Sequence, residues 1–288
     1  MSMQLKKEIK KDKATFKAFN KLAVNVFELS FEKWYEKGYW RDKYFPYTLF
    51  DGDKAVANVS ASMIHTLVGG EPKLYIQIGT VMTDAHYRGR WLSRRLIQAL
   101  IEEWQDKCDG IYLYANDTVL DFYPRFGFEK ATEYRYSKLI NARPTGFIKL
   151  NMDQEADVKL LENYYNNGNP FSERPMLYNF GLLMFYCGTF LKDCVYYSEA
   201  LACVVIASYE ENVMTCYDIY CDEQKAMDSI LQSIAQKETT IITFGFMPKE
   251  TIGCTIEVLE NEDQLFVYSN KENMFNESKM MLPLLSHA

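Results

Sequence analysis

The sequence has few of the residues from which metal sites and disulfide frameworks are built. Three histidines occur in 288 residues, scattered at His65, His86 and His287. The seven cysteines are odd in number and form no Cys-x-x-Cys pair. We therefore expect neither a bound metal nor disulfides, but reduced and mostly buried thiols in a cytoplasmic protein.

Long apolar runs are also missing. No stretch of about 18 or more apolar residues occurs, so we expect no membrane-spanning helix and no membrane partner. The lysine-rich segment Met1–Lys13 lacks an apolar core, which does not fit a secretory signal. Both absences favour a cytoplasmic location.

Charge is distributed unevenly along the chain. Residues 1–145 carry 23 Lys and Arg against 18 Asp and Glu (+5), and residues 146–288 carry 9 against 21 (−12), which gives the net charge of −7. A basic first half suits an anionic ligand. The excess is too small, and too interleaved with acids, to predict nucleic-acid binding. The acidic second half favours solubility, or more weakly a cationic substrate.

The first half has the pattern of an α/β domain, because helical spacing of apolar residues alternates with strand-like segments. It predicts helices at 13–30 and 31–37, strands at 47–50, 55–67 and 74–82, a helix at 90–104, a strand at 111–114, a short helix at 117–123 and a strand at 128–140. Residues 141–146 contain Asn, Pro and Gly and are interpreted as a linker.

The second half has a related order of elements. It predicts helices at 156–165 and 176–190, strands at 197–208 and 213–221, a helix at 223–235, and strands at 239–246, 255–259 and 264–268. We therefore predict two domains, at residues 1–143 and 144–288.

The most informative segment is the turn Tyr87-Arg88-Gly89-Arg90-Trp91-Leu92-Ser93, which follows a predicted strand and begins a predicted helix. Successive backbone N–H groups at a helix N-terminus attract a pyrophosphate, helped by the helix dipole. Arg88 and Arg90 add positive charge, and Gly89 permits close approach of the backbone.

This turn resembles the phosphate-binding pattern R/Q-x-x-G-x-G/A of the GNAT N-acetyltransferase family. Arg88 fills the first position and Ser93 the last, whereas Trp91 stands where the family usually has Gly. A second landmark follows at 116–128, which resembles the family segment N-x-x-A…F/Y-Y-x-x-x-G-F with Val119 in place of the small residue.

The resemblance implies a GNAT fold, with a mixed central sheet flanked by helices, and acetyl-CoA as co-substrate. It implies that Tyr123 protonates the leaving CoA thiolate and that the backbone N–H of Val81 holds the oxyanion. Tyr123 could instead be a packing aromatic, and Asn116 could cap the helix that it precedes. The implied cofactor-binding residues are Val81, Thr83, Arg88, Gly89, Arg90, Trp91, Leu92, Ser93 and Asn116.

No general base is apparent, because the predicted strand at 74–82 contains no Asp or Glu. A water chain could take the proton instead, or the amine could attack as its free base. The run at 88–96 is similar to the "enhanced intracellular survival" type of acetyltransferase, which carries tandem GNAT-like domains and uses its C-terminal carboxylate in the active site. That resemblance implies a catalytic role for the carboxylate of Ala288, approached by an apolar segment at 280–285.

The second half lacks a turn like the predicted phosphate-binding turn of the first half. Its strand-to-helix junction at 221–225 has Asp and Glu but no Gly or Arg, and acids at a helix start would repel a phosphate. We expect a degenerate GNAT-like domain that does not bind CoA, and that covers the acceptor site or forms a homodimer.

The sequence thus predicts an N-acetyltransferase that acts on a primary amine of a small molecule or peptide. The alternative is a non-catalytic acyl-CoA-binding or regulatory module.

Overall fold

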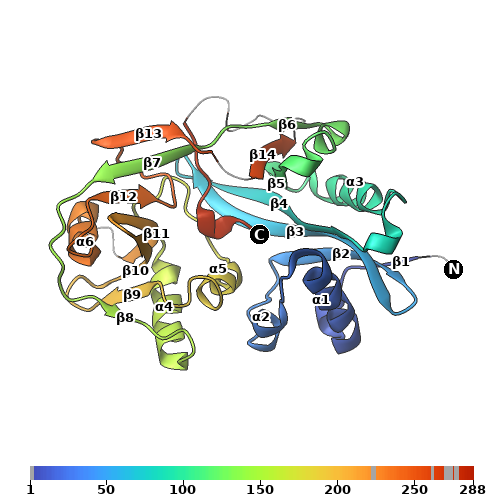
Figure 1. The fold of residues 1–288 in the computed structure, drawn as a ribbon, viewed down its shortest axis with the longest axis horizontal. Helices are drawn as coiled ribbons and strands as arrows, with labels where there is room; N and C mark the ends of the chain where they lie inside the picture. The colour runs from blue at the N-terminus through green and yellow to red at the C-terminus, as the bar shows by residue number, and fades with distance from the viewer. Residues whose placement is uncertain (1–2, 222–224, 261–262, 269–274, 276–278) are drawn as a thin grey trace.

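The computed structural model describes residues 3–221, 225–260, 263–268, 275 and 279–288. Two seven-stranded mixed sheets lie beside each other, with helices packed against both (Figure 1). The predicted α/β class, with one helix-flanked sheet followed by a second, is confirmed.

The first sheet has the strand order β1-β2-β3-β4-β5-β14-β6. Its β4 and β5 are parallel, and its other neighbours are antiparallel. Its strands are β1 (Gln4–Lys6), β2 (Tyr44–Asp51), β3 (Lys54–Val68), β4 (Glu71–Thr83), β5 (Gly110–Asn116), β6 (Phe128–Lys130) and β14 (Asp263–Tyr268).

The second sheet has the order β13-β7-β12-β11-β10-β9-β8, and its parallel pair is β11 and β12. Its strands are β7 (Tyr134–Leu139), β8 (Ile148–Lys149), β9 (Val195–Ser198), β10 (Cys203–Glu210), β11 (Val213–Cys221), β12 (Ile241–Phe244) and β13 (Cys254–Val258).

Side-chain caps and the helical spacing of apolar residues determine where helices begin. In the first helix, for example, the Asp12 side chain accepts the backbone N–H groups of Ala14 and Thr15, which satisfies the helix start. The α-helices are α1 (Lys13–Phe27), α2 (Glu32–Glu36), α3 (Leu92–Trp104), α4 (Glu155–Asn167), α5 (Phe180–Cys187) and α6 (Met227–Ile234). The 3₁₀ turns are η1 (Ile9–Lys11), η2 (Ala85–Tyr87), η3 (Asp117–Val119), η4 (Tyr123–Phe126) and η5 (Leu284–Ser286).

The same unit occurs once in each sheet. A parallel strand pair requires a crossover connection, and α3 joins β4 to β5 as α6 joins β11 to β12. The second half is therefore built like the first, as the order of predicted elements indicates.

The two halves exchange strands. Strand β7 leaves the first half and pairs with β12 and β13 in the second sheet, whereas β14 returns and pairs with β5 and β6 in the first. The predicted boundary at 143/144 therefore does not separate the two sheets. The single predicted strand at 128–140 is wrong for the same reason, since the chain leaves one sheet after Lys130 and enters the other at Tyr134.

Two other predicted elements differ from the structure. The strand at 197–208 is two strands, β9 and β10, joined by a tight turn in which Ala202 has a φ of 46°. In place of the predicted helix at 117–123, the structure has two short 3₁₀ turns: η3 covers its first three residues, and η4 begins at Tyr123 and contains Pro124.

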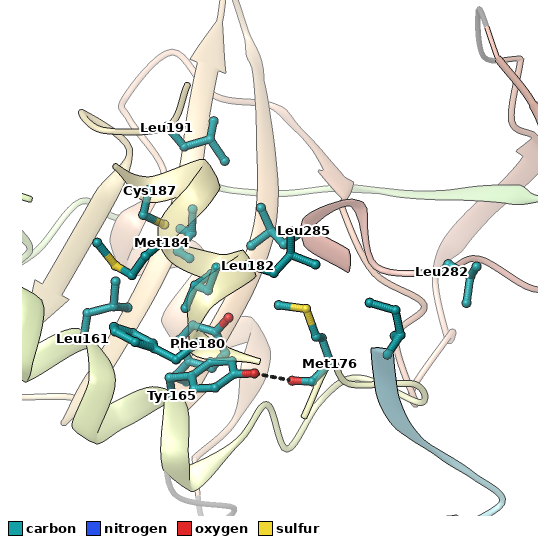
Figure 2. Close-up of a cluster of buried hydrophobic side chains, with 14 of the residues drawn as sticks. Leu161, Tyr165, Met176, Phe180, Leu182, Met184, Cys187, Leu191, Leu282 and Leu285 are labelled. Carbon is teal, nitrogen blue, oxygen red and sulfur yellow. Dashed lines mark hydrogen bonds between the residues drawn. The ribbon is translucent and has the colours of Figure 1, made fainter. Parts of the chain in front are cut away.

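Helix α5 and the C-terminal segment join the halves. A Cβ atom built on Gly181 would lie 2.3 Å from the Tyr39 carbonyl oxygen, and the Trp34 indole donates to the Gly181 carbonyl at 2.6 Å. Figure 2 shows Leu282 and Leu285 in the same buried cluster as the α5 side chains, and both are 1% exposed. The tail is therefore part of the core.

Candidate active site

A cavity of about 870 Å³ opens where strands β4 and β5 separate. Their parallel pairing ends at Ile78 and Leu113, and beyond this point both strands contribute to the cavity wall. Ligand sites of α/β proteins often lie at such a strand-end opening. The lining residues are Val26, Phe27, Gln77, Ile78, Gly79, Thr80, Val81, Thr83, Arg88, Ser93, Tyr114, Ala115, Asn116, Thr118, Val119, Phe122, Tyr123, Phe185, Tyr186, Asp263, Leu284, His287 and Ala288.

A β-bulge shapes the β4 wall. Ser60 pairs with Gly79 but Asn58 pairs with Met82, so β4 has one residue more than β3 between these pairs. Thr80 lies in the bulge with a φ of 45°, and its carbonyl accepts the Asn58 amide at 3.0 Å. The bulge interrupts the ladder beside Val81, at the cavity wall, where an oxyanion donor is expected.

The turn before α3 forms another part of the wall. Arg88 and Ser93 line the cavity, and the Ser93 hydroxyl lies 3.2 Å from the Thr83 hydroxyl. The first N–H groups of a helix have no intrahelical acceptor, so the start of α3 offers donors there. Of the predicted cofactor-binding residues, the cavity brings together Val81, Thr83, Arg88, Ser93 and Asn116.

The remaining predicted turn residues are not among those that line the cavity. Gly89 has a φ of 76°, and the Arg90 guanidinium packs over the Tyr87 ring at 4.7 Å. The side chain of Leu92 is buried in the core of the first half, at 5% exposure. These residues shape the turn at the edge of the cavity without lining it.

Trp91 occupies the position where glycine is usual in the resembling pattern. Its φ is 58°, in the left-handed region that glycine adopts without strain. Its side chain is 58% exposed, and the Arg94 guanidinium lies over its ring at 5.7 Å. The tryptophan therefore points into solvent and does not line the cavity.

Tyr123 lies in η4, lines the cavity and is 5% exposed. Its ring packs near those of Phe122, Phe128 and Phe266. Burial raises the pKa of its phenol to about 12, and the nearby charge of Asp263 acts in the same direction. The hydroxyl therefore remains protonated at neutral pH, and the side chain both packs and faces the cavity.

Asn116 ends β5 and caps η3, since its side-chain oxygen accepts the Thr118 backbone N–H at 3.1 Å. This capping contact is the alternative that the sequence left open for Asn116. The residue also lines the cavity, so capping does not remove it from the site.

The last residue of the chain, Ala288, lies in the cavity next to β4. Its backbone N–H donates to the Gln77 side-chain oxygen at 2.9 Å, and the Gln77 amide donates to the Ala288 oxygen at 3.1 Å. The Tyr186 hydroxyl donates to the His287 carbonyl at 2.6 Å. Three hydrogen bonds thus hold the tail at the centre of the site.

Several residues of this wall were not predicted. Gln77 is 2% exposed, and the sequence feature that could have indicated it is a single amide side chain within an otherwise apolar strand. His287 packs on the Tyr114 ring with centroids 4.1 Å apart, and burial lowers the pKa of His287 to about 4. Tyr114 donates to Glu133, which also accepts the Leu282 N–H. No sequence signal links residues this distant along the chain.

The corresponding opening of the second half is filled. The Gly245 N–H donates to the Cys216 carbonyl at 2.7 Å, and a Cβ atom on Gly245 would lie 2.8 Å from the Tyr217 Cα atom. The Leu284 N–H donates to the Gly245 carbonyl at 2.8 Å. Protein thus closes the strand-end opening between β11 and β12. Residues 222–224 of the junction at 221–225, on which the expectation of no CoA binding rests, lie outside the described residues.

The residues that line the first cavity are of the chemical types that bind an acyl-CoA. The arginine and free helix-start donors suit phosphates, the splayed strands offer backbone groups for an amide-containing arm, and the volume is in the range of ligand sites. Among the described residues, no cluster of three or more His, Cys, Asp or Glu side chains is placed to hold a metal. None of the helices in the described part of the chain is long and apolar enough to cross a membrane.

Solved structures of similar fold cover most of the chain. A probable N-acyltransferase of unknown function from Enterococcus faecalis V583 covers 93% of this chain and 72% of its own, at 14% identity and a TM-score of 0.60. A GCN5-related N-acetyltransferase from Kribbella flavida covers 92% of this chain and 71% of its own, at 14% identity and a TM-score of 0.56. Eis1 from Mycobacterium abscessus covers 92% of this chain and 73% of its own, at 11% identity and a TM-score of 0.54. At these identities the likeness shows the fold.

Sequence comparison matches the first half to a known type of domain. No curated protein sequence matches the chain. A family model described as an acetyltransferase (GNAT) domain matches residues 8–131, the segment that contains β4, the turn, α3, β5 and Tyr123. Residues 8–131 therefore match a GNAT acetyltransferase domain, and the two sheets together have the tandem GNAT fold of these structures.

Proposed function

We propose that this protein transfers the acetyl group of acetyl-CoA to a primary amine of a small molecule or peptide. The observation that carries the proposal is the convergence, in one cavity, of the turn residue Arg88, the bulge at Val81 and the phenol of Tyr123. All three line the cavity that opens where β4 and β5 separate.

Each group has a role in the transfer. The amine nitrogen forms a bond to the thioester carbonyl carbon, and the negative charge that develops on oxygen is stabilised by the Val81 backbone N–H. When the carbon–sulfur bond breaks, Tyr123 gives its proton to the thiolate. Arg88 and the start of α3 hold the phosphates and so orient the thioester.

The proton of the attacking amine requires an acceptor, and none of the described residues lining the β4 wall is an Asp or Glu. We assign this role to the carboxylate of Ala288, held against β4 by Gln77.

The test is calorimetric titration with acetyl-CoA, followed by a CoA-release assay with amine acceptors. We expect saturable binding by the wild type and its loss in Arg88→Glu, because the new carboxylate repels the phosphates. Arg125→Glu, an exposed arginine outside the cavity, is the matched charge-reversal control. Binding without CoA release from any acceptor would favour the rival, a non-catalytic acyl-CoA-binding module.

A further inference from the structure

One wall of the active-site cavity is apolar and aromatic. It is formed by Val26 and Phe27 at the end of α1, by Phe185 and Tyr186 on α5, and by Leu284 of the tail. We call these five residues the α1/α5 wall. None of these five residues has a role in the proposed acetyl transfer itself.

The α1/α5 wall lies next to the bulge of β4. The Thr80 hydroxyl is 2.6 Å from the Tyr44 hydroxyl, and the Tyr44 ring packs near Phe31 and Trp34. The Phe185 ring contacts the same two rings, with centroids 5.6 and 5.7 Å away. An amine that approaches the bulge from this side would therefore have its substituent against the α1/α5 wall.

Charged side chains are few in the cavity, and none of them belongs to the α1/α5 wall. Among its described lining residues, Arg88 and Asp263 are the charged ones, and neither belongs to the α1/α5 wall. Asp263 pairs in register with Asn116, on the side of the cavity where Tyr123 lies. The acidic excess of residues 146–288 thus does not place a carboxylate side chain on this wall.

This distribution selects among amines. A polyamine or aminosugar would bring a second ammonium group, beyond the one that faces the Ala288 carboxylate, against apolar side chains without a partner, which is costly. A single amine on an apolar arm would bury that arm and expose no second charge. Apolar surroundings also favour the neutral amine, the form that can attack a thioester.

The exposure of Phe27 points the same way. Its side chain is 46% exposed although it lines the cavity, so apolar surface remains to be covered when a substrate binds. Resting on the proposed function, we infer that the acceptor is a monoamine carried by an aromatic or aliphatic arm, and that the α1/α5 wall selects it over polycationic amines.

The test compares phenethylamine with 1,4-diaminobutane and spermidine as acceptors of acetyl-CoA. We expect kcat/KM for phenethylamine to exceed that for either polyamine by about tenfold or more, the discrimination typical of an apolar pocket. In Phe27→Glu, the new carboxylate should lower this ratio about tenfold. Val24→Glu places the same charge on the same turn of α1, at a 42% exposed residue outside the cavity lining, and should change the ratio by less than about twofold.

Two outcomes overturn the inference alone: polyamines that react as well as phenethylamine, or equal effects of Phe27→Glu and Val24→Glu. Absence of transfer to every amine would instead refute the proposed function. Ligand-observed NMR of phenethylamine and 1,4-diaminobutane, with CoA bound, then decides the inference separately, because the α1/α5 wall should still bind the aromatic amine preferentially.

Discussion

The oxygen of Ala288 lies against the backbone of Gly79 so closely that a Cβ atom on Gly79 would be 2.2 Å from it. No side chain other than hydrogen fits at this β4 position while the tail is in place. Gly79 is therefore required by the docked tail, and not by its own backbone conformation, since its φ is not positive.

We expect Gly79→Ala to destabilise the protein by about 1–3 kcal/mol, as overpacking commonly does. Because the clash is with Ala288, deleting that residue in the Gly79→Ala background should remove most of this loss. Urea unfolding of the two single variants and the double variant measures the coupling. Additive free energies of unfolding would show that the tail does not occupy this position.

We expect Tyr123→Phe to lower the rate of acetyl transfer about 10²- to 10⁴-fold, because the phenol is the proposed proton donor to the thiolate. The affinity for acetyl-CoA, measured by calorimetry, should change little. Tyr268→Phe is the matched control, since Tyr268 also packs on Phe128 but does not line the cavity. A Tyr123→Phe enzyme with full turnover would remove the phenol from the mechanism.

The left-handed backbone of Trp91 predicts an unusual order of stabilities. Trp91→Gly should be more stable than Trp91→Ala by about 1 kcal/mol, because only the alanine retains the strain of a Cβ atom at positive φ. At the neighbouring Arg90, which has no positive φ, the order should be reversed. Chemical denaturation of the four variants checks this, and the same order at both positions would contradict it.

Glu133 predicts how stability depends on pH. Burial raises the pKa of its carboxyl from 4.5 to about 7 in the folded protein. Between these values the unfolded state has lost the proton that the folded state keeps, so this contribution to stability falls as pH rises from about 4.5 to 7. Glu133→Gln has no carboxyl at this position, so its stability lacks this pH-dependent contribution.

The free energy of unfolding of Glu133→Gln, relative to the wild type, should therefore rise by about 2–3 kcal/mol between pH 5 and pH 8. Urea titrations at several pH values measure this difference. Glu129→Gln, at an exposed residue of β6, should follow the wild type at every pH. A pH-independent difference for Glu133→Gln would show that the carboxyl titrates normally.

The parts of the site that could be predicted are local in the sequence. An apolar strand followed by the turn at Arg88 and an amphipathic helix specifies β4, the turn and α3 within some 30 residues. Asn116 and Tyr123 follow on the next strand end. Strand, turn and helix each have their own local pattern, so the sequence predicts each of them independently of the rest of the fold.

The rest depends on contacts between distant residues. Residues 128–140 have strand character throughout, and nothing local indicates that Lys130 and Tyr134 belong to different sheets. The α1/α5 wall combines residues from α1, α5 and the tail, which are spread along the sequence from Val26 to Leu284. Each residue there is a common apolar type whose role arises from placement.

The strand exchange also sets an order of events during synthesis. The first sheet cannot form its β5–β14 pairs until residues 263–268 have left the ribosome, by which time the second sheet is largely available. The edge of β5 must wait through about 150 residues of translation, at some 5–20 residues per second. A nascent chain paused before β14 would present an unpaired strand edge beside the unfinished acetyl-transfer site, a species for chaperones to protect.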